Sequence, residues 1–133
     1  MTAVLAIDPG REKWGLAVVD GGGASLHREV ISADDAPARV KDLLALHPVS
    51  AVLLGDRTGS KAAREGIGAL PVPLTLVPED RTTLLARRLY WRDHPPTGWR
   101  RLIPVSLQLP PVPLDAYAAE ALALRHFGLL DEE

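Results

Sequence analysis

Apolar and polar residues fall into blocks along the chain that predict a mixed α/β fold. Three strand-like segments come first: the apolar runs Ala3 to Ile7 and Trp14 to Val19, then the weaker run Ala24 to Ile31. The second and third are joined by three consecutive glycines, Gly21 to Gly23. Because glycine-rich tight turns connect antiparallel strands, we expect a three-stranded meander.

Helices and short buried strands alternate after this meander. In the segment Ala36 to Leu46, apolar residues recur at helical spacing, and His47-Pro48 ends the pattern. The segment His94 to Pro113 carries six prolines, which exclude a central strand or a long helix. The remaining expected elements are a strand at Ala51 to Leu54, a helix at Lys61 to Ala69, a strand at Val72 to Val77, and helices at Thr82 to Arg92 and Asp115 to Phe127.

The resulting order, βββαβαβα plus a C-terminal helix, predicts a mixed five-stranded sheet with helices on both faces. In such sheets ligands bind beyond the carboxyl ends of the parallel strands. The chain has 133 residues, of which 47% are apolar and 24% charged, so we expect one globular domain over residues 1–133.

Composition also narrows the classes of partner. The chain has no cysteine, which excludes disulfides and cysteine-ligated zinc. It has no apolar run of roughly twenty residues and no signal-peptide pattern, so we expect a cytoplasmic protein without a membrane partner.

Acidic residues stand at the ends of the predicted parallel strands. Asp8 ends the first strand and is followed by Pro9-Gly10, while Asp56 follows the fourth strand and Glu79-Asp80 follow the fifth. Asp115 opens the last helix. If these strands are neighbours, the carboxylates meet at one edge of the sheet, where they repel one another unless cations lie between them. Oxygen ligands alone select Mg²⁺ or Mn²⁺. Two such ions roughly 4 Å apart can support phosphodiester hydrolysis.

Each acid also has a plain structural interpretation. Asp8 can begin a hairpin turn, and Asp56, Glu79, Asp80 or Asp115 can cap a helix. Glu120 is five residues beyond Asp115, so we expect it to point elsewhere, at the surface.

Arginine and aromatic residues concentrate between residues 81 and 101. This window holds six arginines against one acid, Asp93, together with Tyr90, Trp91 and Trp99. Such a composition can bind phosphates and stack on bases. The alternative is a solvated helix face with Trp91 packed inward.

These residues resemble the YqgF (RuvX) family, relatives of the RuvC Holliday junction resolvases in the ribonuclease H-like superfamily. Asp8-Pro9-Gly10 with Gly15 matches the opening Asp-x-Gly-x4-Gly motif, and Leu54-Gly55 matches an apolar strand that ends in glycine. Residues 79–83 resemble the Asp-Glu-Arg-x-Ser/Thr signature with its two acids exchanged, and residues 115–119 match the Asp-x-x-x-Ala pattern. At residues 55–57 the family's Gly-Leu-Pro is replaced by Gly-Asp-Arg.

The resemblance implies a ribonuclease H-like nuclease domain that uses Mg²⁺ or Mn²⁺. Members are linked to maturation of the small-subunit ribosomal RNA precursor and to junction resolution. Carried over by motif, Asp8, Glu79 and Asp115 are catalytic and bind metal, with Asp80 or Asp56 in reserve. The residues expected to contact DNA or RNA are Arg11, Lys13, Arg81, Arg87, Arg88, Arg92, Trp99, Arg100 and Arg101.

Three functions compete at this stage. The first is a nuclease on structured DNA or RNA, as a monomer or a homodimer. The second is a nucleic-acid-binding factor for rRNA maturation or DNA repair with weak or no cleavage. The third is a phosphotransferase of the sugar-kinase type, whose opening strand also carries Asp-x-Gly but which needs a second lobe that we do not expect in 133 residues.

Overall fold

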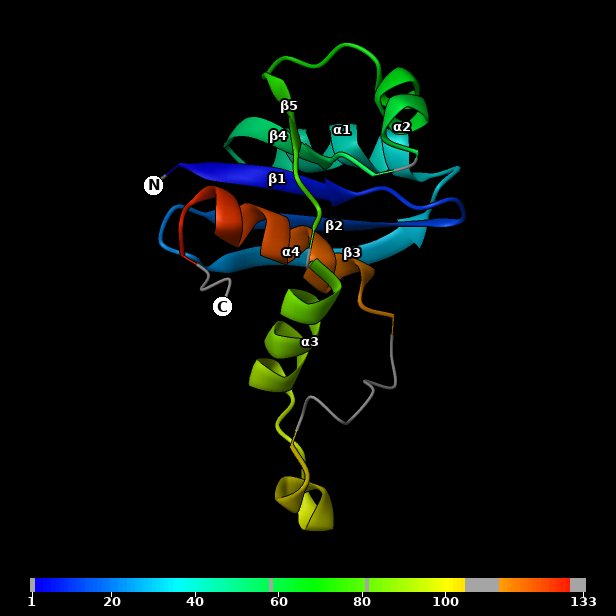
Figure 1. Ribbon diagram of the computed structural model, residues 1–133. Coiled ribbons are helices and arrows are strands. Elements are labelled where there is room, and N and C mark those ends of the chain that lie inside the picture. The colour runs from blue at the N-terminus through cyan, green and yellow to red at the C-terminus, as the bar shows by residue number, and fades with distance from the viewer. Residues whose placement is uncertain (1, 58, 81, 105–112, 130–133) are drawn as a thin grey trace.

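The computed structural model describes residues 2–57, 59–80, 82–104 and 113–129. These residues form a five-stranded sheet in the order β3-β2-β1-β4-β5 with helices around it (Figure 1). The strands are β1 (Ala3–Asp8), β2 (Lys13–Asp20), β3 (Ser25–Ser32), β4 (Val49–Gly55) and β5 (Leu74–Val77). The helices are α1 (Ala36–Leu46), α2 (Ser60–Ile67), α3 (Thr82–Asp93), α4 (Asp115–His126) and the short 3₁₀ helix η1 (Gly98–Leu102).

The strand pairing confirms the predicted fold class. β1 and β3 both pair antiparallel with β2, which makes the expected meander. β4 pairs parallel with β1, and β5 pairs parallel with β4. The three parallel strands are therefore neighbours, and their carboxyl ends lie at the same edge of the sheet.

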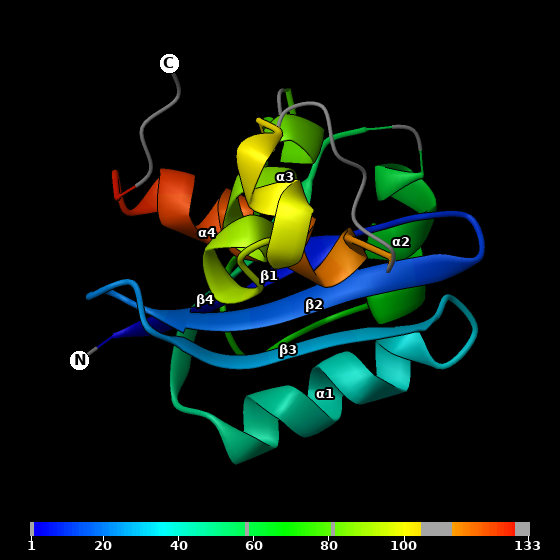
Figure 2. The same ribbon diagram turned by 90° about the horizontal axis from the view of Figure 1, so that it is seen from below.

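Helices cover both faces of the sheet. Figure 2 shows α1 on one face and α3 with α4 on the other. Side chains alternate along β1 because successive residues of a strand point to opposite faces. Leu5 and Ile7 belong to the core shared with α1 and α2, whereas Val4 and Ala6 belong to the core shared with α3 and α4. Each face of the sheet therefore packs against its own apolar cluster. Burying one such leucine or isoleucine contributes about 1.5–3 kcal/mol to the stability of the fold.

Element boundaries differ from the predicted ones near glycine and proline. β5 begins at Leu74 rather than Val72, directly after Pro73, which has no N–H for a ladder hydrogen bond. α2 ends at Ile67 because Gly68 adopts a positive φ of 73°. No helix among the described residues is long and apolar enough to cross a membrane.

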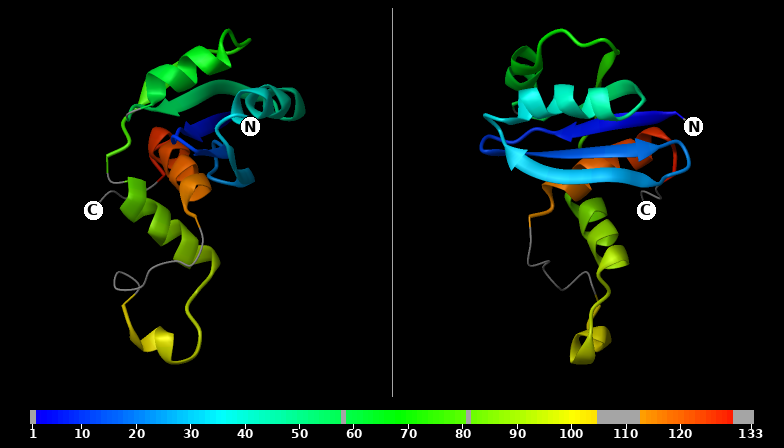
Figure 3. Two further views of the ribbon diagram at one scale, coloured as in Figure 1. Left: turned by 90° about the vertical axis from the view of Figure 1, so that its right-hand side faces the viewer. Right: turned by 180° about the vertical axis from the view of Figure 1, so that it is seen from behind.

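α3 leads away from the sheet and ends in a projecting segment. Residues 94–104, here called the arm, include η1 and lie at the far end of α3 (Figure 3). Trp99 and Leu102 on the arm are 68% and 87% exposed. The arm occupies the start of the proline-rich segment predicted to lack a long helix, and residues 105–112 of that segment lie outside the described residues.

Candidate functional site

Asp8 stands between two glycines on one row of the sheet. It is the last residue of β1, and strand alternation directs its side chain to the same face as Val4 and Ala6, toward α3 and α4. Its partner across the antiparallel pair is Gly15. On the other side Ile7 pairs with Leu54, so Gly55 is the next residue beside Asp8 on β4.

The two glycines give a second and a third acid room to approach Asp8. A Cβ at Gly15 would collide with the main chain of Asp115, because the first turn of α4 rests directly on β2 there. A Cβ at Gly55 would collide with the side chain of Glu79, which crosses over β4. Asp115 and Glu79 therefore flank Asp8 from opposite sides, at the carboxyl end of the parallel strands.

Glu79 and Asp115 both act electrostatically on Asp8. Burial, followed by hydrogen bonding and repulsion from Glu79 and repulsion from Asp115, raises the pKa of Asp8 to about 8, while the charge of Arg57 opposes the rise. Burial also raises the pKa of Asp115, and Lys13 opposes that shift. Among the described residues, the charge of Arg57 is thus too weak to offset the effects that raise the pKa of Asp8.

The polypeptide around Glu79 holds its side chain in place. Glu79 is 1% exposed, and its Oε2 accepts the backbone N–H of Arg57 at 2.9 Å. Its carbonyl oxygen accepts the Arg57 guanidinium at 3.0 Å and the Thr82 hydroxyl at 2.7 Å. Its own N–H donates to Oδ1 of Asp56 at 3.2 Å. Arg57 is thus a site residue that sequence reasoning missed, although the replacement of the family's Gly-Leu-Pro marked the position.

The donor set fits a hard divalent cation. Oε1 of Glu79 is buried and finds no hydrogen-bond donor among the described residues, so a bound cation or a proton on Asp8 would satisfy it. The ligands on offer are carboxylate oxygens, as Mg²⁺ and Mn²⁺ prefer. Within the described ranges, no three Asp, Glu, His or Cys side chains already form a complete metal-binding cluster. Asp8 and Glu79 would therefore hold the ion, with Asp115 turning toward them.

The two reserve candidates lie differently. The Asp80 side chain is 68% exposed and pairs with Arg125 of α4 at 3.1 Å, so it is engaged away from Asp8. Asp56 contributes by accepting the Glu79 N–H rather than by facing Asp8. The structure thus brings together Asp8, Glu79 and Asp115, and leaves Asp80 outside that group.

The predicted nucleic-acid contacts spread over three places. Arg11 and Lys13 are exposed beside the acidic edge, at the turn after β1 and the start of β2. Arg87 is half-buried and Arg88 exposed on α3, while Trp99, Arg100 and Arg101 lie on the arm. Arg81 lies outside the described residues.

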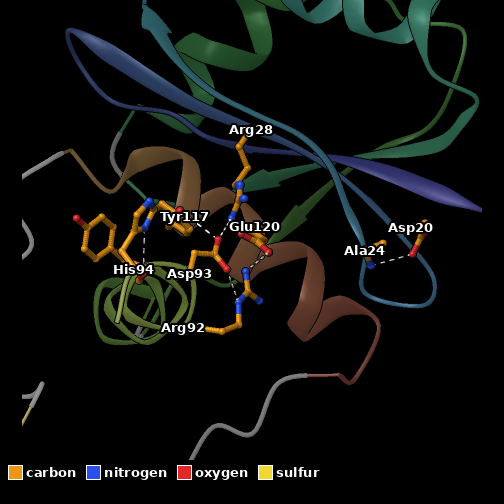
Figure 4. A network of polar contacts seen from close by, with 9 residues as sticks. Asp20, Ala24, Arg28, Arg92, Asp93, His94, Tyr117 and Glu120 are labelled. Atoms are coloured by element: carbon orange, nitrogen blue, oxygen red, sulfur yellow. Dashed lines mark hydrogen bonds and ion pairs between the residues drawn. The ribbon is translucent and has the colours of Figure 1, made fainter. Parts of the chain in front are cut away.

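Arg92 is committed to a polar network, and this corrects the expectation for Glu120 (Figure 4). Glu120 is 1% exposed rather than at the surface. It accepts Arg28 of β3 at 3.0 Å and Arg92 of α3 at 3.2 Å, and both arginines also bind Asp93. The surface expectation was wrong because α4 is covered by the sheet on one side and α3 on another, so its polar face is buried too.

We expect Glu120→Ala to lower the free energy of unfolding by about 2 kcal/mol. The loss stays below that of a fully buried pair because Arg28 and Arg92 are 30% and 47% exposed and water can solvate them. Urea denaturation measures the effect. Glu120→Gln keeps the shape and an acceptor oxygen, so its free energy of unfolding should lie between those of Glu120→Ala and the wild type. A loss of less than about 0.5 kcal/mol for the alanine variant would show that the network contributes nothing to stability.

Comparison with known proteins identifies the fold. No family model matches the chain, and no curated protein matches it by sequence. Among solved structures, RuvC of T. thermophilus in complex with a Holliday junction substrate is similar with a TM-score of 0.60 and 23% identity, over 95% of this chain and 92% of that one. A second structure of Thermus thermophilus RuvC gives a TM-score of 0.57 at 23% identity, over 94% and 92% of the two chains. The chain therefore has the ribonuclease H-like fold of RuvC.

Proposed function

We propose that this protein is a divalent-metal-dependent nuclease that hydrolyses phosphodiester bonds in structured nucleic acid, a RuvC-like enzyme of the YqgF type. One observation carries the proposal: Glu79 and Asp115 flank Asp8 over two glycines, and the buried Oε1 of Glu79 has no described donor. Folding alone gives no reason to gather acids at a site where burial, hydrogen bonding to Glu79 and repulsion raise the pKa of Asp8 to about 8.

The shared fold supports the choice of substrate class. The similar RuvC structure is bound to a Holliday junction substrate, so branched DNA is the first substrate to test. The resemblance of the motifs to the YqgF family adds the ribosomal RNA precursor as the second. Cutting a four-way junction symmetrically requires two active sites, so we infer a homodimer on that substrate and none for RNA trimming.

Each residue of the site has a distinct role in the proposed hydrolysis. Bound divalent cations would supply an activated water and charge for the leaving oxygen. Asp8 and Glu79 would hold them, and Asp115 would complete the set from the start of α4. Arg57 fixes the backbone and the carboxylate of Glu79 through two hydrogen bonds. Lys13 supplies positive charge beside Asp115, where a phosphate would enter.

A second candidate function is a nucleic-acid-binding factor that cleaves weakly. The observation in its favour is that no complete cluster of three ligand side chains stands ready among the described residues. Binding without cutting would still use the basic surfaces of α3 and the arm.

Cleavage assays separate the two functions. We expect the protein to cut four-way junctions, single strands or precursor rRNA with Mg²⁺ or Mn²⁺ and to lose that activity in EDTA. Purified protein that binds these substrates but cuts none of them with either ion would overturn the nuclease proposal and leave the binding factor.

The α3 arginines should contribute phosphate contacts. Replacing Arg87 and Arg88 together by alanine should weaken binding about equally across sequences and reduce the slope of log affinity against log salt by roughly one to two. Fluorescence anisotropy at several salt concentrations measures both quantities. An unchanged slope would remove α3 from the interface.

Arg57→Ala should lower cleavage about 10- to 100-fold, the usual cost of losing a group that orients a metal ligand. The variant loses the guanidinium bond to the Glu79 carbonyl and the charge that opposes the raised pKa of Asp8. Its cleavage profile should therefore shift to higher pH. Arg57→Lys keeps the charge, so it should retain the wild-type profile at a reduced rate. If the alanine variant cuts at the wild-type rate and pH, Arg57 has no role in the site.

A further inference from the structure

A cavity of about 460 Å³ opens on the α1 and α2 side of the sheet. Its size falls within the usual range of small-molecule sites. Arg11 and Trp14 line it from the β1–β2 turn and the start of β2, Pro37 from α1, and Ala62 and Gly66 from α2. None of the acids described above contributes to its wall.

The cavity is one loop away from the acidic edge. The turn that leaves Asp8 passes through Gly10 and Arg11, both of which line the cavity. Gly10 keeps this turn tight, because a Cβ there would collide with the carbonyl oxygen of Lys13. Trp14 immediately precedes Gly15, on which Asp115 rests. The acids and the cavity therefore occupy opposite faces of the same edge of the sheet.

The side chains that line the cavity suit a ligand in which a flat apolar ring is attached to an anionic group. An indole, a pyrrolidine ring and the small residues of α2 form uncharged walls, and Arg11 supplies the one cation among the described lining residues. Trp14 is 5% exposed, so it is fixed by the core rather than free to move. The cavity stays open because Ala62 and Gly66, one helical turn apart on α2, carry almost no side chain.

We propose that this cavity binds an unpaired nucleobase of the nucleic acid whose backbone crosses the acidic edge, with Arg11 contacting the adjoining phosphate. The inference rests on the proposed function and names a specificity element for it. A base offers two flat faces to the apolar walls, and its own phosphate lies within reach of a neighbouring cation. A strand held over Asp8 can direct one unstacked base around the Gly10 turn to the other face.

The test compares filling the cavity with removing the base. Ala62 is exposed on a helix, so Ala62→Leu narrows the cavity without disturbing the core, and Ala62→Phe narrows it further. Ala38→Leu, the same change at an exposed position of α1 outside the cavity lining, is the matched control. Binding of four-way junctions is measured by fluorescence anisotropy with Ca²⁺ replacing Mg²⁺, and each junction carries one abasic site, moved position by position.

In the wild-type protein we expect one abasic position to weaken binding about tenfold, the cost of a lost stacking contact. Ala62→Leu should weaken binding of the intact junction to a similar extent and make it indifferent to that abasic position. Ala38→Leu should behave as wild type. An Ala62→Leu variant that keeps the full abasic sensitivity, or a flat abasic scan in the wild type, overturns the proposal.

Two further outcomes are distinguishable. If the abasic scan is flat and Ala62→Phe instead changes the sedimentation coefficient, a second copy of the chain covers the cavity and the base proposal falls. If junction cleavage persists in both Ala62 variants while the scan is flat, only the cavity proposal fails. Wild-type protein that binds no nucleic acid would remove the proposed function and this inference together.

Discussion

Asp8→Asn should abolish cleavage and at the same time stabilise the metal-free protein. Asparagine keeps the shape of Asp8 but removes a charge that Glu79 and Asp115 repel, and its amide can donate to the unsatisfied Oε1 of Glu79. The cleavage rate should fall at least about 100-fold, because replacing a residue that only orients a metal ligand already lowers activity 10- to 100-fold. Unfolding free energy at pH 8 should rise by about 1 kcal/mol or more.

The direction of the pH dependence follows from the raised pKa. Burial and the neighbouring acids raise the pKa of Asp8 in the folded protein from its ordinary value of 3.8 to about 8. Between these values the folded state binds more protons than the unfolded state, so the stability of the metal-free protein declines as pH rises from about 4 through 8. The Asp8→Asn protein should lack this contribution to the decline. Added Mg²⁺ or Mn²⁺ should bind the ionised form of Asp8 and so remove this pH-dependent decline in stability from the wild type.

Urea denaturation from pH 5 to 8.5, together with cleavage rates, tests both halves of this prediction. Asp80→Asn is the matched control, because it removes an exposed carboxylate next to Glu79 that pairs with Arg125 instead. It should retain cleavage within about twofold and the wild-type pH trend. If Asp8→Asn cuts at the wild-type rate, Asp8 is not part of the active site. If the variant is less stable than the wild type at pH 8, Glu79 and Asp115 do not repel Asp8 as described.

Gly15→Ala should destabilise the protein by about 3 kcal/mol or more, a large effect for one methyl group. The added Cβ would meet the backbone of Asp115 and Ala116, which cannot yield as a flexible side chain would. Either β2 or the first turn of α4 must move. The variant should also lose cleavage activity, because a displaced α4 carries Asp115 away from Asp8 and Glu79.

Gly66→Ala is the control for a glycine replacement that has room. The nearest atom to its added Cβ is Cγ of Pro37 at 3.7 Å, an ordinary contact. Alanine in this helix interior should stabilise the protein by about 0.5–1 kcal/mol. Thermal and urea denaturation of both variants provide the comparison. A Gly15→Ala protein within 1 kcal/mol of wild type would show that α4 does not rest on β2 as described.

The three-stranded meander, the mixed five-stranded sheet and the position of Asp8 could be predicted from sequence because each depends on local patterns. Apolar runs separated by glycine turns specify the meander, and an acid after a buried run specifies a strand end. The choice between Glu79 and Asp80 could not be predicted in this way. It depends on how the chain turns after β5, and the structure shows Glu79 under the Arg57 backbone and Asp80 turned to Arg125.

Residues that matter through distant partners were also beyond sequence reasoning. Helical spacing predicted that Glu120 points away from Asp115, but it carried no information that Arg28 of β3 would approach from ninety-two positions earlier in the chain. Arg57 was likewise hidden, because its effect on Asp8 and Glu79 arises from the neighbouring ends of β4 and β5.

The Glu120 network has a mechanical consequence for the arm. Arg92 and Asp93, at the end of α3 where the arm begins, are fastened to α4 through Glu120 and Tyr117. Glu120 is five residues from Asp115, about 7.5 Å along the same helix. α4 thus connects the end of α3, where the arm begins, to Asp115. For the proposed nuclease, we therefore expect a displacement of the arm by its substrate to be transmitted through α4 to Asp115.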